Sequence, residues 1–348
     1  MHQYGIHLVK AALSAAHFAG VDGLLAPLTR GLGVIFMLHH VRPEPPRAFE
    51  PYRILKVTPT FLENVILQVK AAGFDTISLD DVPARLAPGY EGPPFACFTL
   101  DDGYKDNRDH AYPVFKRHNV PMGIYISTTF ADGTGDLWWL VLEAVIERAP
   151  HVSVQMDGAI RHFPTATVAE KSLAHDKIYW WLRQLPEDRA RLVVAELAAS
   201  IEYDPTGLCR ELVMNWDELR ELARDPLVTF GGHTRRHLAL AKLPAEEAQA
   251  EIAGSIARIE AELGRPCRHF SYPYGCPQSA NRREFEMVER LGLATAVTTR
   301  KGLIWRRHAR AMQALPRFSL NGDFQDARYT KVMLSGAPFA VWNAMRRS

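Results

Sequence analysis

The sequence contains the run Phe95-Ala96-Cys97-Phe98-Thr99-Leu100-Asp101-Asp102-Gly103, in which mostly apolar residues are followed by two carboxylates and a glycine. Short apolar runs that end in turn residues are typical of strands buried on both faces of a parallel sheet. A helix is expected to follow over 107–118, which completes a strand–helix unit. The two carboxylates then lie at the carboxyl end of a strand, where parallel sheets carry ligand-binding residues.

The same strand–helix pattern recurs along most of the chain. The other predicted strands are Val34–Leu38, Thr76–Leu79, Met122–Ile126, Leu227–Gly232, His269–Tyr272, Ala294–Thr298 and Ala314–Leu320. The other predicted helices between them are Thr60–Ala72, Trp216–Arg224, Pro244–Leu263 and Ser279–Leu291. Capping boxes are expected at Thr60 with Glu63 and at Asn215 with Glu218. Six to eight such units predict an α/β fold with a closed or nearly closed barrel of parallel strands.

A mainly helical segment interrupts this rhythm over 127–209, and we interpret it as an insertion on the barrel rim. The barrel is then expected to consist of 31–126 and 210–325, with a helical lead-in at 1–30 and a C-terminal tail at 326–348. The lead-in either packs on the domain or makes peripheral contact with a membrane surface. Packing is favoured because its polar face is not strongly basic.

Composition excludes several classes of protein. The 348 residues include 41 basic and 39 acidic side chains, so no electrostatic footprint for nucleic acid is present. The four cysteines show no CxxC spacing, which indicates a reducing compartment rather than a disulfide framework. No apolar stretch is long enough to span a bilayer, and no export signal is evident. A cytoplasmic location is the expectation.

Two histidines provide the partners for the carboxylates. The run Gly231-Gly232-His233-Thr234-Arg235-Arg236-His237 follows another predicted strand and spaces two imidazoles four residues apart. Together with Asp101 and Asp102 they form a ligand set suited to one borderline divalent ion with an open position for water. One aspartate would bind the ion while the other takes a proton from water. The alternative for Asp-Asp-Gly is a helix N-cap with a turn. A lone HxxxH pattern is weak evidence for a metal site, because two unrelated polar residues near a strand end produce it as well.

A third strand end carries aromatic residues. The run Phe270-Ser271-Tyr272-Pro273-Tyr274-Gly275 is interpreted either as a groove wall that offers a backbone N–H to an oxyanion or as an ordinary aromatic turn. Trp138 and Trp139, in the insertion, could stack on sugar rings, but a place in the core is favoured.

In this order, the three segments resemble the polysaccharide deacetylase family, which is also called the NodB-homology domain or carbohydrate esterase family 4. The resemblance is direct over Phe95–Gly103, Phe230–His237 and His269–Gly275, and looser over Gly33–Asp132 and Asn215–Leu320. It implies a distorted (β/α) barrel, here of seven to eight strands. It also implies a metal-dependent hydrolase that acts on N-acetylated glycans.

The resemblance implies a role for each matching residue. Asp101 would be the general base, and Asp102 would bind the metal together with His233 and His237. Tyr274 would offer its backbone N–H to the tetrahedral oxyanion. The ion would be Zn²⁺ by default for this ligand set, although other divalent ions fit.

This sequence departs from the family pattern at two positions. Leu100 replaces an aromatic residue, which is an apolar exchange. Ser271 stands where the family has an arginine that orients the base. Arg317, at the end of the last predicted strand, is the candidate substitute, with a surface arginine as the equally weighted alternative.

The family's late histidine, which acts as general acid, has no clear copy here, because His308 looks solvated. The first barrel strand ends in Leu38-His39-His40, and the first and last strands of a closed barrel are neighbours. The segment His39-His40-Val41 is similar to an early motif of poly-N-acetylglucosamine deacetylases. We assign His40 as the general acid. The alternative is that His40 caps a backbone group or supports another residue of the site.

The function expected from these residues is removal of N-acetyl, or similarly small acyl, groups from an amino-sugar-containing glycan or glycan precursor. One alternative is a carbohydrate-binding protein of the same fold with impaired catalysis. The other alternative is a hydrolase of a small non-sugar amide.

Overall fold

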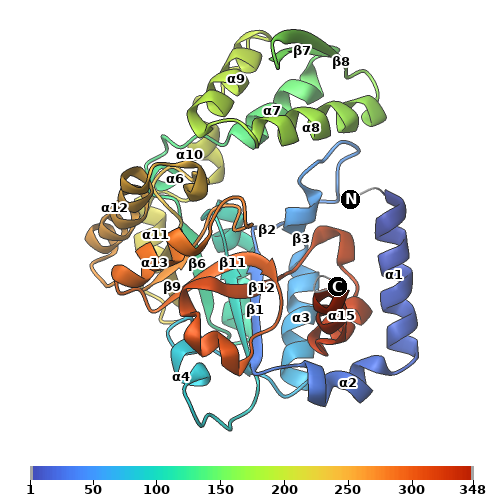
Figure 1. Ribbon diagram of the computed structural model, residues 1–348, viewed down its shortest axis with the longest axis vertical. Coiled ribbons are helices and arrows are strands. Elements are labelled where there is room, and N and C mark those ends of the chain that lie inside the picture. The colour runs from blue at the N-terminus through green and yellow to red at the C-terminus, as the bar shows by residue number, and fades with distance from the viewer. Residues whose placement is uncertain (1–2, 346–348) are drawn as a thin grey trace.

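The computed structural model describes residues 3–345, and its centre is a barrel of parallel strands (Figure 1). The sheet has the order β1-β12-β11-β10-β9-β6-β5-β4, and β1 also pairs with β5. That last pairing closes seven strands into the predicted barrel and leaves β4 as an extra strand beside β5. The strands are β1 (Gly33–Leu38), β4 (Asp75–Thr76), β5 (Phe95–Leu100), β6 (Met122–Ile126), β9 (Val228–Gly232), β10 (His269–Ser271), β11 (Thr295–Lys301) and β12 (Leu315–Ser319).

Alternate residues of each strand supply two different parts of the core. On β5, for example, Phe98 points outward and packs under the surrounding helices, whereas Cys97 points into the barrel. The helices around the barrel are α3 (Pro59–Ala71), α4 (Val82–Leu86), α5 (Tyr112–Arg117), α11 (Trp216–Leu222), α12 (Ala245–Leu263) and α13 (Arg282–Arg290). The interior of the barrel is therefore filled by side chains, so a ligand can bind only at the ends of the strands.

Two local expectations are wrong. The strand predicted at Thr76–Leu79 pairs only over Asp75–Thr76. The helix α3 is capped by Thr58, whose hydroxyl accepts from the backbone N–H of Phe61, and not by Thr60. The reason is Pro59, which is pre-organised for the first helical position and moves the cap to the residue before it. The second capping box, at Asn215 with Glu218, is confirmed.

The segment predicted as an insertion consists of α6 (Thr128–Ala131), α7 (Trp138–Arg148), β7 (His151–Met156), β8 (Ala159–Pro164), α8 (Val168–Leu182), α9 (Glu187–Ala199) and α10 (Leu208–Leu212). Most of it, from α7 to α9, forms a lobe above the barrel in Figure 1, whereas α6 and α10 lie near α12 at the side of the barrel. β7 and β8 form an antiparallel hairpin. Apolar side chains from this segment build most of a second core, to which Phe49, Tyr52, Tyr104 and Val213 also belong. It includes Trp138 and Trp139, so their expected place in the core is confirmed.

The chain's two ends pack together on one side of the barrel (Figure 1). The helical lead-in consists of two helices, α1 (Gln3–Phe18) and α2 (Val21–Thr29), and both lie against α14 (Ala327–Leu334). α2 also contacts α15 (Ala337–Met345). Among the described residues no single helix is long and apolar enough to cross a bilayer. α1 and α2 reach that length and composition only as a pair, and they are bent by 103° where they meet.

Candidate active site

Three predicted ligands converge at the carboxyl ends of two barrel strands. Asp102 follows β5, and His233 and His237 follow β9. The Oδ1 atom of Asp102 lies 3.4 Å from Nε2 of His233 and 3.4 Å from Nε2 of His237. One ligand atom from each residue falls within 4.8 Å of the others, and all three residues are buried. Asp102 and His233 are 131 positions apart in the sequence. They meet because β5 and β9 flank β6 in the sheet.

The donor atoms fit a divalent metal ion. Oδ1 of Asp102 is buried and has no hydrogen-bond partner among the described residues, which is unusual for a buried carboxylate oxygen. His233 donates from Nδ1 to the backbone carbonyl of Ser271 at 2.6 Å, so its Nε2 lone pair faces Asp102. Burial lowers the pKa of His237 to about 3, which keeps its imidazole neutral, as a ligand must be. Two imidazole nitrogens and one carboxylate are a ligand set typical of zinc.

The backbone is strained at these strand ends. Asp102 (φ 74°), Thr234 (φ 64°), His237 (φ 57°) and Tyr274 (φ 61°) all have positive φ, a region that residues other than glycine rarely adopt. They are four of the seven such non-glycine residues in the part of the chain that the structure describes. Strain of this kind clusters at functional sites, where the surrounding fold holds it in place.

Asp101 is held by Arg317, which the sequence proposed as the substitute for the missing arginine. Nη1 and Nη2 of Arg317 donate to the two carboxylate oxygens of Asp101 at 2.8 and 2.7 Å. The arginine is 1% exposed and also donates to Oγ of Ser271, the residue at the family's arginine position, at 3.1 Å. The alternative of a surface arginine is therefore wrong. Burial would raise the pKa of Asp101, but the charge and hydrogen bonds of Arg317 outweigh it and hold the pKa below its ordinary value.

The two early histidines follow β1 directly and contact different carboxylates. β1 and β5 pair in register from Gly33 with Phe95 to Leu38 with Leu100, so the next residue, His39, comes opposite Asp101. Nε2 of His39 lies 3.9 Å from Oδ2 of Asp101.

His40, which the sequence favoured, belongs to the two-residue strand β2 (His40–Val41) and makes different contacts. Its Nδ1 lies 2.7 Å from Oδ2 of Asp106, and its ring packs on Tyr104 with centroids 3.8 Å apart. The sequence analysis thus missed His39 as the histidine beside Asp101. Strand alternation could have identified His39. Ile35 faces the interior of the barrel, so Met37 and His39, two and four residues later, are expected to face it as well.

Tyr274 joins the third motif to the insertion. Its backbone N–H donates to no acceptor among residues 3–345, so it is available to a bound molecule. Its ring packs edge-on against His237 at 4.9 Å, and its hydroxyl accepts from Nε1 of Trp138 at 3.0 Å. Trp139 also reaches the ring of His237, at 5.0 Å. The insertion therefore covers one metal-ligand candidate and the third motif directly.

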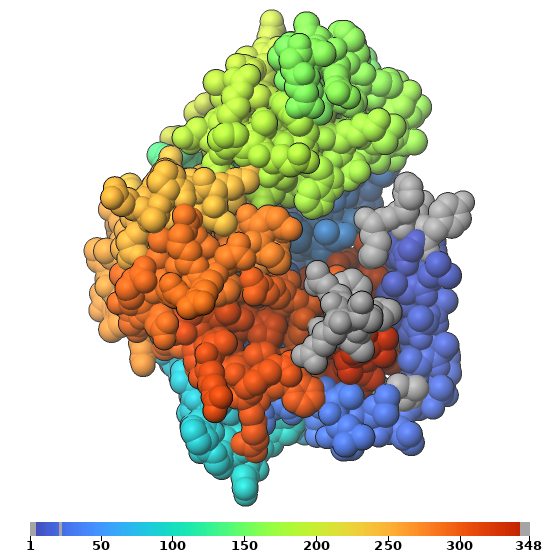
Figure 2. All heavy atoms as spheres, in the orientation of Figure 1, coloured from blue at the N-terminus to red at the C-terminus, as the bar shows by residue number. Residues whose placement is uncertain are grey.

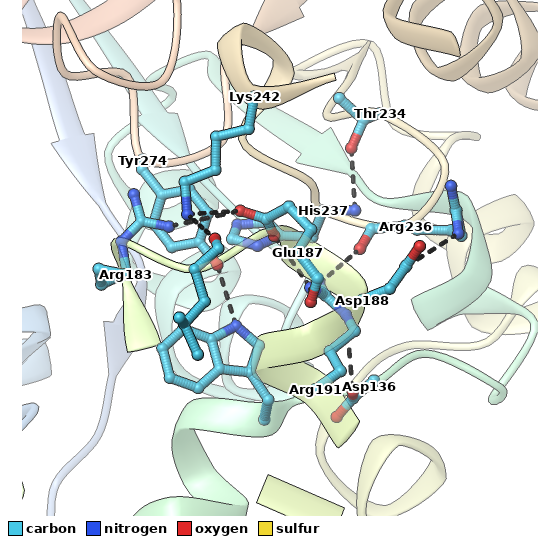
Figure 3. Close-up of polar contacts among 12 residues, drawn as sticks. Asp136, Arg183, Glu187, Asp188, Arg191, Thr234, Arg236, His237, Lys242 and Tyr274 are labelled. Atoms are coloured by element: carbon cyan, nitrogen blue, oxygen red, sulfur yellow. Dashed lines mark hydrogen bonds and ion pairs between the residues drawn. The ribbon is translucent and has the colours of Figure 1, made fainter. Parts of the chain in front are cut away.

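A group of charged residues fastens the insertion to the barrel beside this site (Figure 3). We name it the Glu187 cluster; it consists of Glu187, Arg183, Arg191 and Lys242. Oε2 of Glu187 accepts from Nη1 of Arg191 at 2.9 Å, and Oε1 lies 3.5 Å from Nζ of Lys242. Arg183 lies 3.9 Å from Oε1, and its guanidinium covers the ring of Tyr274 at 3.4 Å. Lys242 comes from the barrel half of the chain, so the cluster bridges the two lobes.

Comparison with known proteins gives a consistent result. Residues 189–296 match the model of the polysaccharide deacetylase family. This range includes the histidine and tyrosine motifs but not the aspartate pair. No curated protein matches the sequence.

Solved structures with similar folds come from several bacteria. The Streptococcus pyogenes deacetylase PplD in complex with acetate is 15% identical, with a TM-score of 0.55 over 83% of this chain and 92% of that one. IcaB from Ammonifex degensii is 16% identical, with a TM-score of 0.53 over 86% of this chain and 98% of that one. A de-N-acetylase from Aggregatibacter actinomycetemcomitans is 13% identical, with a TM-score of 0.50 over 86% of this chain and 98% of that one. At these identities the likeness shows a common fold. The family-model match over residues 189–296 and the closed seven-stranded barrel with its extra strand agree with the resemblance seen in the motifs, so the chain carries a segment of polysaccharide deacetylase type within a fold shared with solved deacetylases.

Proposed function

We propose that this protein is a metal-dependent hydrolase that removes N-acetyl, or similarly small acyl, groups from an amino-sugar-containing glycan or glycan precursor. The observation that carries the proposal is the convergence of Asp102, His233 and His237 beside Asp101, which Arg317 holds. The fold is shared with a deacetylase solved with acetate and with a de-N-acetylase, which agrees with this reaction. The cytoplasmic location stays a prediction.

Asp102, His233 and His237 are the residues that would hold the ion. When bound, a divalent ion supplies Lewis-acid chemistry and lowers the pKa of water toward neutrality. Zn²⁺ is the expected ion because of the nitrogen and carboxylate donors, and other divalent ions fit the same set.

Proton transfer is assigned to residues of the chain itself. Asp101, kept ionised by Arg317, accepts a proton from the attacking water. The backbone N–H of Tyr274 donates to the oxygen of the acyl group as negative charge develops on it. A proton delivered to the leaving nitrogen then completes hydrolysis to a free amine and a carboxylate.

We assign that last proton to His39 in place of His40. His39 lies beside Asp101, whereas Nδ1 of His40 is engaged by Asp106. Burial lowers the pKa of His39, and the charges of Asp101 and Asp102 oppose that effect. His40 is better suited to supporting the loop that carries Tyr104, on which its ring packs.

The test pairs metal analysis with acetate release from a panel of N-acetylated glycans, including chitooligosaccharides and lipid- or nucleotide-linked amino sugars. The wild type is expected to hold one divalent ion and to release acetate from at least one amino sugar. Asp101→Asn should keep the ion and lose turnover by about 10²–10⁴-fold, because the base is removed while the ligands remain. A metal-loaded wild type that binds glycans without releasing acetate would favour a binding protein, and release from simple amides alone would favour the non-sugar hydrolase.

A further inference from the structure

The outward face of α1 is apolar, which is the reverse of the usual arrangement for a helix on a protein surface. Leu13 is buried against the protein. The opposite face presents Leu8 (73% exposed), three alanines and Phe18 (77% exposed), and His7 is the one exposed polar residue among the described side chains of α1. The alanines are Ala11, Ala12 and Ala15. With this spacing they form one stripe along the helix.

The stripe continues across the bend into α2. Ala19 and Gly20, between the helices, are exposed. On α2 the exposed residues with described side chains are Gly23, Leu24 (82%), Pro27 and Leu28 (76%), and none is charged or polar. Figure 2 shows these helices, in blue, at the edge of the molecule. We name the exposed side chains of Leu8, Phe18, Leu24 and Leu28 the N-terminal apolar face.

Other exposed apolar residues do not form such a face. Leu173 (56% exposed) and Trp180 (58% exposed) lie on α8 of the insertion. There, Asp176 and Lys177 are exposed between them. Scattered single exposures of this kind are ordinary for a protein surface, whereas a continuous apolar face indicates a contact site.

The charges near the face match an anionic surface. Residues 3–33 contain only one acidic residue, Asp22, beside the cations Lys10 and Arg30. The guanidinium of Arg328, from α14, lies 5.8 Å from the centre of the Phe18 ring. It is ion-paired with Asp326 at 2.6 Å, so Lys10 and Arg30 are the cations that remain. Cations at the border of an exposed apolar face are the arrangement with which helices lie in the interfacial region of a bilayer.

We propose that the N-terminal apolar face docks the protein onto the surface of a phospholipid bilayer, with α1 and α2 lying in the interface rather than crossing it. The side chains of Phe18 and Leu24, at the corner between the helices, enter the acyl boundary most deeply. Because only a few cations accompany the face, apolar insertion supplies most of the affinity and anionic lipid adds a smaller part.

The experiment is vesicle flotation of the full-length protein with phosphatidylcholine vesicles, with and without phosphatidylglycerol. Wild type is expected to float with both and more strongly with the anionic mixture. Phe18→Glu combined with Leu24→Glu should lower the partition coefficient by at least about a hundredfold, since each side chain contributes about tenfold or more. Ile160→Glu with Leu173→Glu, which alters two exposed apolar residues of the insertion, is the matched control and should float like the wild type.

Thermal unfolding of all three proteins separates a loss of binding from a loss of folding, because both pairs of positions are exposed. Absence of wild-type flotation with either vesicle would overturn the proposal. So would equal loss in the control pair, or a wild-type dimer that the Phe18/Leu24 pair dissociates without any vesicle binding, which would make the partner a second copy. Flotation requires no turnover, so this result is independent of the proposed hydrolase activity.

Discussion

Two buried carboxylates, Asp102 beside His237 and Glu187 beside Tyr274, have opposite surroundings. Glu187, in the joint between insertion and barrel, faces Arg183, Arg191 and Lys242. Among the described residues, the ion-pair partners of Asp102 are the imidazoles of His233 and His237, and its Oδ1 has no hydrogen-bond partner. Burying a carboxylate is unfavourable unless an opposite charge or hydrogen bonds compensate it.

The difference separates a structural ion pair from a candidate ligand site. The Glu187 cluster carries its own cations, so it can hold the two lobes together without any added ion. The carboxylate of Asp102 has no arginine or lysine among its ion-pair partners in the described part of the chain, and a neutral imidazole offers it no positive charge. A bound divalent ion is the compensation that its surroundings leave open.

The largest expected effect is loss of the ion. His233→Ala should reduce bound metal from one ion per chain to near zero and lower acetate release by at least about a thousandfold, because one of only three protein ligands is gone. Inductively coupled plasma mass spectrometry checks the metal content, and a chelator should reproduce the loss in the wild type. The control is Glu187→Gln, which should retain the ion. Unchanged metal in His233→Ala would contradict the ligand assignment.

The next contrast is between the two early histidines. His39→Ala should lower kcat by about 10²-fold or more, as expected for loss of a proton donor, with metal content unchanged. His40→Ala should mainly lower the melting temperature, because Asp106 loses a buried partner while Arg42 remains. Steady-state kinetics and thermal unfolding of both variants check this. The reverse pattern would restore His40 as the general acid.

The Glu187 cluster predicts a change in stability without a change in metal. Glu187→Gln leaves three cations without their shared carboxylate and should lower the free energy of unfolding by about 3 kcal/mol. Glu196→Gln, on the same helix but with a side chain that is 59% exposed, should change it by less than about 0.5 kcal/mol. Urea unfolding measures both. Equal effects of the two substitutions would show that the cluster does not fasten the insertion.

The smallest effect concerns acid stability of the insertion. Burial lowers the pKa of His175 to about 4 from its ordinary 6.5, and its Nε2 lies 2.8 Å from the hydroxyl of Tyr52. Above pH 6.5 this histidine is neutral in both the folded and the unfolded chain. Below that pH the unfolded chain takes up the proton first, so stability falls as the pH drops from 6.5 to about 4. Between pH 7 and pH 5 the loss should be about 2 kcal/mol.

Urea unfolding at the two pH values measures this loss. His175→Gln keeps a polar side chain but removes the titration, and its stability should differ less between pH 7 and pH 5. A wild-type stability that is the same at both pH values would contradict a buried neutral His175.

Sequence reasoning predicted the parts that depend on local pattern and on strand order. The limits of β5 and β6 agree with the predicted runs, since short apolar stretches ended by turn residues leave little choice of boundary. The meeting of Asp102 with His233 and His237 followed from placing each motif at the carboxyl end of a parallel strand. The bidentate contact of Arg317 with Asp101 was one of two alternatives that the sequence left open.

Other features depend on three-dimensional packing. Which of His39 and His40 reaches Asp101 depends on strand register, because a shift of one residue reverses the face on which a side chain lies. The Glu187 cluster needs the insertion folded back onto the barrel, which no local spacing predicts.

The same holds for α1. Its composition predicted an amphipathic helix, yet only its packing against α14 decided that apolar side chains point outward. The sequence by itself therefore determined the strands, their polar ends and the ligand types, because these follow from short-range periodicity. The tertiary structure alone decided which side chains share a cavity and which face solvent, because those depend on elements distant in the chain.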